Sequence, residues 1–192
     1  MNEKTRALLI MIGILLACIL AISYAFYQLS FTSEEDNIKG GTRCFDLTFE
    51  GLNAIHMPAA LPISEAEGIL TDPYTFTITN ICNTKIRYEV NLEVLNPEAE
   101  NALGLQFIRY KFGIGNDETP TLLGSATTVT STITGSQAKL MGTGELATEG
   151  DSVTYNLRLW MDDKAAPANE YYELVKGKVF NAKISVISTA IR

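Results

Sequence analysis

The chain has 192 residues, enough for one ordinary domain and a short additional segment. Fifteen Lys and Arg against 22 Asp and Glu give a formal net charge of −7, and no basic cluster occurs, which argues against nucleic acid as a partner. Hydrophobic residues make up 46% of the chain, so it can bury a core of normal size.

A run without charged residues lies near the start of the chain, at residues 7–27 (ALLIMIGILLACILAISYAFY). As a helix it would span about 31 Å, enough to cross the hydrocarbon core of a bilayer. Lys4 and Arg6 precede the run, and three acidic residues follow at 34–36. This asymmetry predicts a cytoplasmic N-terminus, contact with the membrane through residues 7–27, and an exported remainder.

We therefore predict two parts. Residues 1–32 form a cytoplasmic tip and a signal or anchor helix, and residues 33–192 form an extracellular domain. The domain would lie on the outer face of the plasma membrane if the helix is retained, or be secreted if it is removed.

The end of the apolar run supports both outcomes. Small residues at Ser23 and Ala25 suit signal-peptidase cleavage between Ala25 and Phe26. The freed end would carry three apolar residues that alternate with polar ones, namely Tyr27, Leu29 and Phe31. Such a strand can add to an open sheet of another subunit. Without cleavage, the same aromatic residues would lie at the membrane interface.

Beyond this run, apolar residues recur with period two, which is typical of strands. The cleanest alternation is IRYEVNLEVL at 86–95, which predicts a half-buried antiparallel strand. The full set of predicted strands is 44–50, 74–82, 86–95, 105–114, 137–146, 151–161 and 177–189. These short strands, separated by turn residues, predict an all-β antiparallel sandwich.

Other segments are predicted from turn and helix signals. A turn near Asn83–Thr84 suggests that the flanking strands form a hairpin. Short helices are expected at 63–68 and 169–175. The Thr-rich segment 115–136 is compatible with a flexible loop or with an edge strand.

The sequence contains three cysteines, one of them (Cys18) inside the apolar run. The other two, Cys44 and Cys82, lie in strand-like segments of the exported part. In an oxidising compartment we predict that they form a disulfide, with two separately buried thiols as the alternative.

Residues that could carry catalysis are few. The sole histidine is His56, and neither an H-E-x-x-H nor a G-x-S-x-G motif is present. We predict a protein that is not an enzyme and that has no cofactor. Asp162 and Asp163 are weak candidates for a cation site, because they lack the spacing of a calcium loop; a solvated loop is the other interpretation. Trp160 and nearby tyrosines suit either sugar stacking or packing in the domain.

The segment at 24–50 (YAFYQLSFTSEEDNIKGGTRCFDLTFE) resembles the opening of exported proteins of the TasA/camelysin group of Gram-positive bacteria. The matching features are Tyr24–Ala25–Phe26, Asn37, Gly41–Thr42 and Asp46–Leu47. The resemblance extends loosely over most of the chain. It implies a jelly-roll-like sandwich preceded by one apolar helix, and a structural role in surface fibres of a biofilm matrix.

Two departures from this group favour an anchored relative over a fibre subunit. The predicted Cys44–Cys82 pair is not a feature of the fibre-forming members, and the apolar run exceeds the usual core of a removable signal. Some relatives have been called metallopeptidases, but the metal motif is absent here.

The expected function is that of an exported structural protein of the cell surface that associates with itself or with other surface proteins. It would form extracellular fibres by strand donation. The alternative is a monomeric, membrane-anchored module that binds a glycan or a partner protein.

Overall fold

Strands dominate the computed structural model, which describes residues 44–191 except for 52–53, 59–61, 116–117 and 166–167. The apolar segment 7–27, the cleavage position at Ala25–Phe26 and the donor residues at 27–31 lie outside the described residues, as does the boundary between residues 32 and 33. Within the described ranges, no helix is long and apolar enough to cross a membrane.

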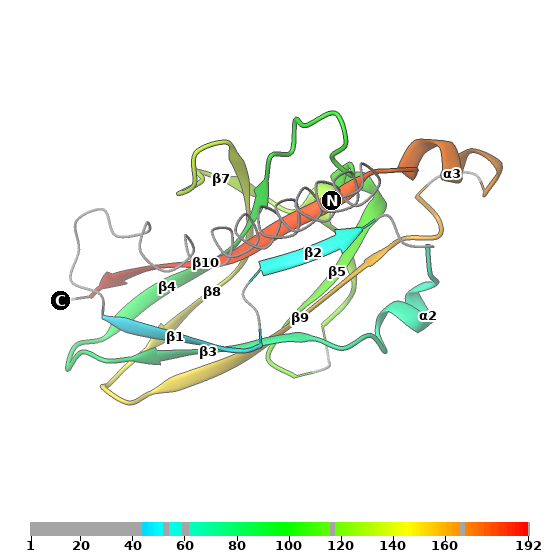
Figure 1. Cartoon of the computed structure of the whole chain (residues 1–192). Helices are drawn as coiled ribbons and strands as arrows, with labels where there is room; N and C mark the ends of the chain where they lie inside the picture. Colours follow the sequence, from blue (N-terminus) through cyan, green and yellow to red (C-terminus); the bar gives the residue numbers. More distant parts are fainter. Residues whose placement is uncertain (1–43, 52–53, 59–61, 116–117, 166–167, 192) are drawn as a thin grey trace, which may run out of the picture. The chain divides into compact units, whose positions relative to one another are not determined.

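Ten strands of the described chain form two antiparallel sheets of five strands each (Figure 1). The first sheet has the order β1-β3-β9-β5-β6. Its strands are β1 (Phe45–Glu50), β3 (Tyr74–Asn80), β9 (Ser152–Met161), β5 (Ile108–Gly113) and β6 (Thr121–Leu122). The second sheet has the order β2-β10-β4-β8-β7. Its strands are β2 (Ala54–Pro58), β10 (Val179–Ala190), β4 (Ile86–Leu95), β8 (Ser136–Leu146) and β7 (Thr128–Val129).

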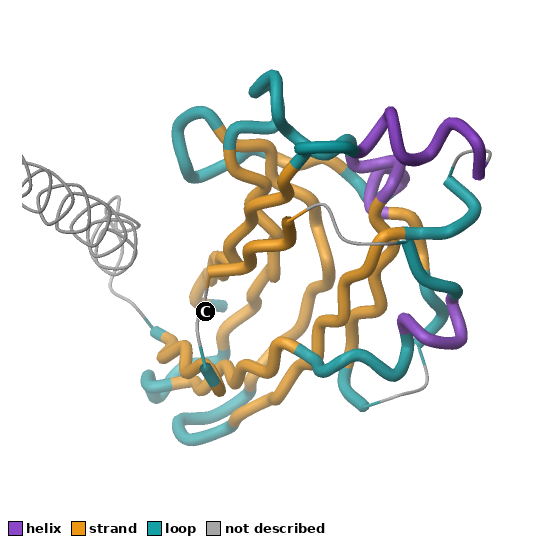
Figure 2. The backbone as a smooth tube through the Cα atoms, turned by 45° about the vertical axis from the view of Figure 1, so that its right-hand side comes forward, coloured by secondary structure: helices purple, strands orange, loops and turns teal. Residues whose placement is uncertain are grey.

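The two sheets face each other as layers (Figure 2), and one face of each long strand fills the space between them. Phe76 and Leu157 of the first sheet and Leu92 of the second are 0% exposed. The ring of Tyr155 stacks on Phe112 at 4.8 Å between centroids. Its hydroxyl also shares a hydrogen bond of 2.9 Å with Tyr88 of the opposite sheet. This hydrogen bond satisfies both hydroxyls at a buried polar contact between the sheets.

Short helices cover the ends of the strands: α2 (Glu65–Gly68), α3 (Ala168–Val175) and the 3₁₀ turns η1 (Leu105–Phe107) and η2 (Leu123–Ser125). Ser64 begins α2 with a capping box, in which its hydroxyl accepts from the Glu67 N–H and the Glu67 carboxylate accepts from the Ser64 N–H. The last residue of α2, Gly68, lies against the indole ring of Trp160.

The prediction of an all-β antiparallel sandwich is confirmed, and so is the Cys44–Cys82 disulfide. The strand at 86–95 has the predicted bounds. The first part of the predicted strand 105–114 is the turn η1. In the segment 115–136, the described residues form β6, η2 and β7.

The predicted hairpin around Asn83–Thr84 is wrong. β3 and β4 belong to different sheets, so the turn between them crosses the sandwich. β3 and β4 each have one apolar face, and both faces pack against the same core from opposite sheets. The two strands therefore do not pair with each other through backbone hydrogen bonds. A strand at Ala54–Pro58 was not predicted, and it contains His56.

Replacing Gly68 with Ala should lower the free energy of unfolding by about 1–3 kcal/mol, the usual cost of overpacking a core. The reason is steric, because a Cβ atom at this position would lie 2.3 Å from the Trp160 ring. Denaturant unfolding followed by Trp160 fluorescence would measure the change.

Gly124→Ala is the matched control, since its Cβ would meet no atom closer than 3.5 Å. Equal stabilities of the Gly68→Ala and Gly124→Ala proteins would contradict this account.

Candidate functional site

The outer edge of the second sheet is only partly covered by a strand. β2 pairs with five of the twelve residues of β10, from Val179 to Lys183. Among the described residues, no strand pairs with this side of β10 over 184–190, whereas β4 pairs with its other side over 182–190. Figure 1 shows β2 alongside one part of β10 while the other part continues toward the C terminus. We call residues 184–190 of β10 the open edge.

The direction of the backbone groups along the open edge follows from its pairing with β4. The Ile191 N–H donates to the Lys85 carbonyl at 2.8 Å, so odd-numbered residues of β10 face β4. The alternate residues therefore direct their N–H and C=O groups away from β4: Ile184, Val186, Ser188 and Ala190. These groups are placed to form a ladder with an added strand.

Apolar side chains on the same side of the sandwich are incompletely buried. Only residues 51–53 connect β1 to β2, so the edge of β1 lies on the same side as β2 and the open edge. The side chains of Phe45, Leu47 and Phe49 point toward the core but are only half-buried. On the same face of β3, in contrast, Phe76 and Ile78 are 0% exposed. An additional strand here would remove apolar surface from water, which is favourable.

The disulfide lies at one end of this side. Cys44 directly precedes β1, and its partner Cys82 follows β3 with a Cα–Cα distance of 5.0 Å. The Ile81 N–H also donates to the Cys44 carbonyl at 3.1 Å. The start of β1 is therefore fixed to the end of β3 by a covalent bond and a hydrogen bond.

A buried carboxylate, that of Glu93, belongs to β4 itself. Glu93 is 0% exposed and accepts hydrogen bonds from the hydroxyls of Ser131 (2.6 Å), Ser136 (2.9 Å), Thr132 (3.0 Å) and Ser185 (3.2 Å) and from the Thr132 N–H (3.1 Å). Burial acts to raise the pKa of Glu93, but the hydrogen bonds from residues 131, 132 and 136 outweigh it and hold the pKa below its ordinary value. Glu93 thus fixes the segment between β7 and β8 to the sheet.

The two residues considered for a cation site, Asp162 and Asp163, differ in burial and in their partners. Asp162 is 3% exposed, and its carboxylate accepts from the Arg109 guanidinium at 3.0 Å, which also binds Glu65. The cationic group of Arg109 therefore already neutralises Asp162. Asp163 is exposed. Across the described ranges, no group of three or more His, Cys, Asp and Glu side chains could hold a metal ion.

The aromatic residues considered for sugar stacking are mostly buried. Trp160, Tyr155 and Tyr171 are each less than 7% exposed, and Tyr171 donates its hydroxyl to the Asp162 carbonyl at 2.9 Å. Tyr172 is exposed. His56 lies within β2 and contacts the Asn181 side chain of β10 at 2.6 Å. The contacts of the buried aromatic residues are those of core packing, and the contact of His56 joins the side chains of two paired strands.

No protein-family model matches the sequence, and no curated protein matches it. A solved structure that does match is described as "AvmM Catalyzes Macrocyclization in Alchivemycin A Biosynthesis". The match covers 78% of this chain and 90% of that chain, with 12% identity and a TM-score of 0.33. Similarity at this level carries no argument about function, and the resemblance to the TasA/camelysin group stays a prediction.

The prediction that this protein is not an enzyme is corrected, because the matching structure is that of an enzyme. That prediction is withdrawn, and a match with a TM-score of 0.33 shows neither the presence nor the absence of catalysis here. The match does not assign catalysis either, since 12% identity transfers no residue role.

Replacing Glu93 with Gln should lower the free energy of unfolding at pH 7 by about 1–3 kcal/mol, since an amide N–H₂ would face hydroxyl donors and leave them unsatisfied. The folded-state pKa lies below the unfolded value of about 4.3, so the contribution of the ionised carboxylate is complete above that value. It is lost as the pH falls through the folded-state pKa. The difference between the two proteins should therefore narrow in acid.

Denaturant unfolding over a pH series would measure this difference. Glu89→Gln is the control, because Glu89 lies on the same strand with its side chain exposed. A Glu93→Gln effect that is absent at pH 7, or that grows in acid, would contradict the assignment.

Proposed function

We propose that this protein is an exported structural protein of the cell surface whose copies join into extracellular fibres by strand donation. Residues 26–32 of one copy would add to the open edge of the next. One observation carries the proposal: seven residues of β10 lack a strand partner on one side among the described residues, next to half-buried apolar side chains of β1.

The side chains of the open edge support its use for pairing. Exposed edge strands are normally protected from other chains by charges, by proline or by a short length. The sequence of the open edge, ISVISTA, contains neither a charge nor a proline. β1 in contrast carries Asp46 and Glu50, while β6 and β7 have only two residues each. The open edge is the long edge without this protection.

The donor segment has the pattern that such an edge accepts. Tyr27, Leu29 and Phe31 alternate with polar residues, so one face of the added strand would be apolar. That face would cover Phe45, Leu47 and Val186, all of which are half-buried. Because donor and acceptor are different surfaces, the contact is head-to-tail and generates a filament if the rotation does not close.

We further infer a jelly-roll topology of eight strands, to which β1 and β7 are added as one outer strand of each sheet. The strand orders β2-β10-β4-β8 and β3-β9-β5-β6 interleave along the chain as two Greek keys do. This supports the resemblance-based expectation for the fold. Retention of residues 7–27 in the membrane and cleavage after Ala25 remain two forms of the proposal, and polymerisation requires the second.

The first test is made on residues 26–192, produced under oxidising conditions. Light scattering should show growing mass, and negative-stain images should show filaments. Deletion of residues 26–32 should abolish both, since the donor strand is lost. A monodisperse monomer from residues 26–192 would contradict strand donation and favour an anchored binding module.

The acceptor is tested separately with Ser188→Pro. This change removes an N–H that faces the open side and leaves the β4 ladder intact, so the monomer should fold while polymerisation falls at least tenfold. Ser188→Ala keeps the N–H and is the matched control. Equal polymerisation of the two variants would show that β10 is not the acceptor.

A further inference from the structure

β1 is a mechanically weak point of attachment for the segment that precedes it. Within the described part of the chain it pairs with β3 alone, through six residue pairs from Phe45–Asn80 to Glu50–Thr75. A pull on the chain before residue 44 would separate these pairs one after another, beginning at Phe45–Asn80. Ladder bonds that break in sequence resist far less than bonds that break together.

The disulfide lies where this separation would begin. Cys44 immediately precedes the first pair of the ladder, and Cys82 lies two residues beyond its partner Asn80. A force that reaches Cys44 therefore continues through the disulfide into the turn 81–85. That turn joins two interior strands, since β3 lies between β1 and β9 and β4 lies between β10 and β8.

The turn 81–85, which receives the force through Cys82, is joined to both sheets through Asn80. The Asn80 side chain is 0% exposed. Its side chain accepts from the Cys82 N–H at 2.9 Å and donates to the carbonyls of Thr84 (2.9 Å) and Leu146 (3.4 Å). Its backbone bonds Gly150 and Asp151, both at 2.8 Å. Asn80 thus connects the end of β3, the turn after it, the end of β8 and the turn before β9.

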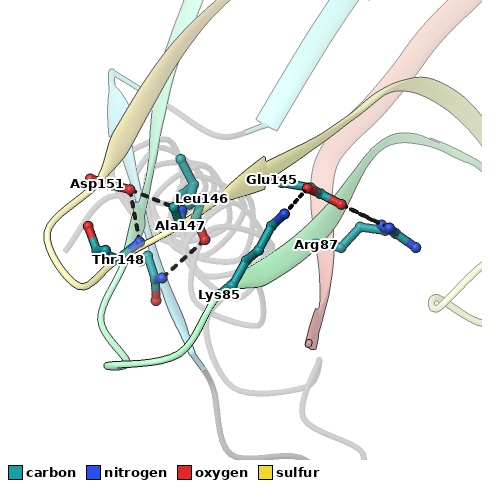
Figure 3. A network of polar contacts seen from close by, with 8 residues as sticks. Lys85, Arg87, Glu145, Leu146, Ala147, Thr148 and Asp151 are labelled. Carbon is teal, nitrogen blue, oxygen red and sulfur yellow. Dashed lines mark hydrogen bonds and ion pairs between the residues drawn. The ribbon is translucent and has the colours of Figure 1, made fainter. Parts of the chain in front are cut away.

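Further polar contacts strengthen the same end (Figure 3). The Asp151 carboxylate accepts from the N–H groups of Ala147 (3.0 Å) and Thr148 (2.9 Å), which fixes the turn between β8 and β9. Glu145 of β8 pairs with Lys85 and with Arg87 of β4. Neighbouring strands of the second sheet are therefore linked beside the turn that receives the force.

We infer that the Cys44–Cys82 disulfide is a mechanical clamp that passes tension from the N-terminal segment to the interior strands and keeps β1 from being peeled away. The inference rests on the proposed function for the origin of the tension. A donated strand held in the next copy and a retained membrane helix would both pull through Cys44.

Pulling on single molecules tests the clamp. The full chain with Cys18→Ala would be held in detergent by handles at its two ends and compared with the same chain carrying Cys44→Ala and Cys82→Ala. The variant should show an early low-force step that releases six residues, about 20 Å of extended chain. It should also gain about 130 Å of final length, because the bridged cysteines are separated by 38 positions in the sequence. The oxidised parent should show neither.

A low-force step in the oxidised parent, or unfolding of the variant at the same force without that step, would overturn the inference. Reducing the parent after it has folded gives a bridge-free molecule without requiring the variant to fold, and it should behave as the variant does. Residues 1–43 are present in every sample, so their extension cancels. Tethered single molecules do not assemble, so failure of the clamp is distinguishable from failure to form filaments.

Discussion

The change of sheets between β1 and β2 is the constraint on which the rest of this domain depends. β1 ends at Glu50, and after three residues the chain continues as β2 in the other sheet. Gly51 has a φ of 112°, a region that favours glycine, so the chain can turn sharply there. β1 thereby becomes a fifth strand of the first sheet, and among the described residues β10 has a strand on one side only over 184–190. The open edge of β10 and the position of β1 at the edge of its sheet therefore both follow from this change of sheets.

Most of the fold could be predicted from side-chain alternation, because each long strand buries one face. Ile86, Tyr88, Val90 and Leu92 gave the bounds of β4 for this reason. β2 was missed because its sequence, AIHMP, is short, does not alternate and ends in proline; it is a strand because β10 offers a partner. The pairing partner of a strand is a tertiary property, and the hairpin error has the same cause.

Only part of the candidate site could be predicted from the sequence. The alternating pattern at 27–31 and the cysteine pair are local features, and the bridge could be predicted because the chain after the apolar run contains just two cysteines. The open edge is defined by a pairing that is missing among the described residues, so no residue pattern could predict it. Glu93 occupied a position that alternation assigns to solvent, yet hydroxyls from a distant loop cover it. Such burial depends on loop placement, which periodicity does not report.

The positions of Cys44 and Ile191 have a consequence for protein engineering. The Cys44 carbonyl bonds Ile81 and the Ile191 N–H bonds Lys85, so both residues lie beside the same five-residue turn. The two ends of the sandwich, being this close, can be joined by a short linker and new ends opened in a surface loop, as circular permutation requires. A permuted chain would move the proposed donor segment to another corner of the sandwich while the proposed acceptor edge stayed in place. The spacing and twist of an assembly could then be varied with the interface itself unchanged.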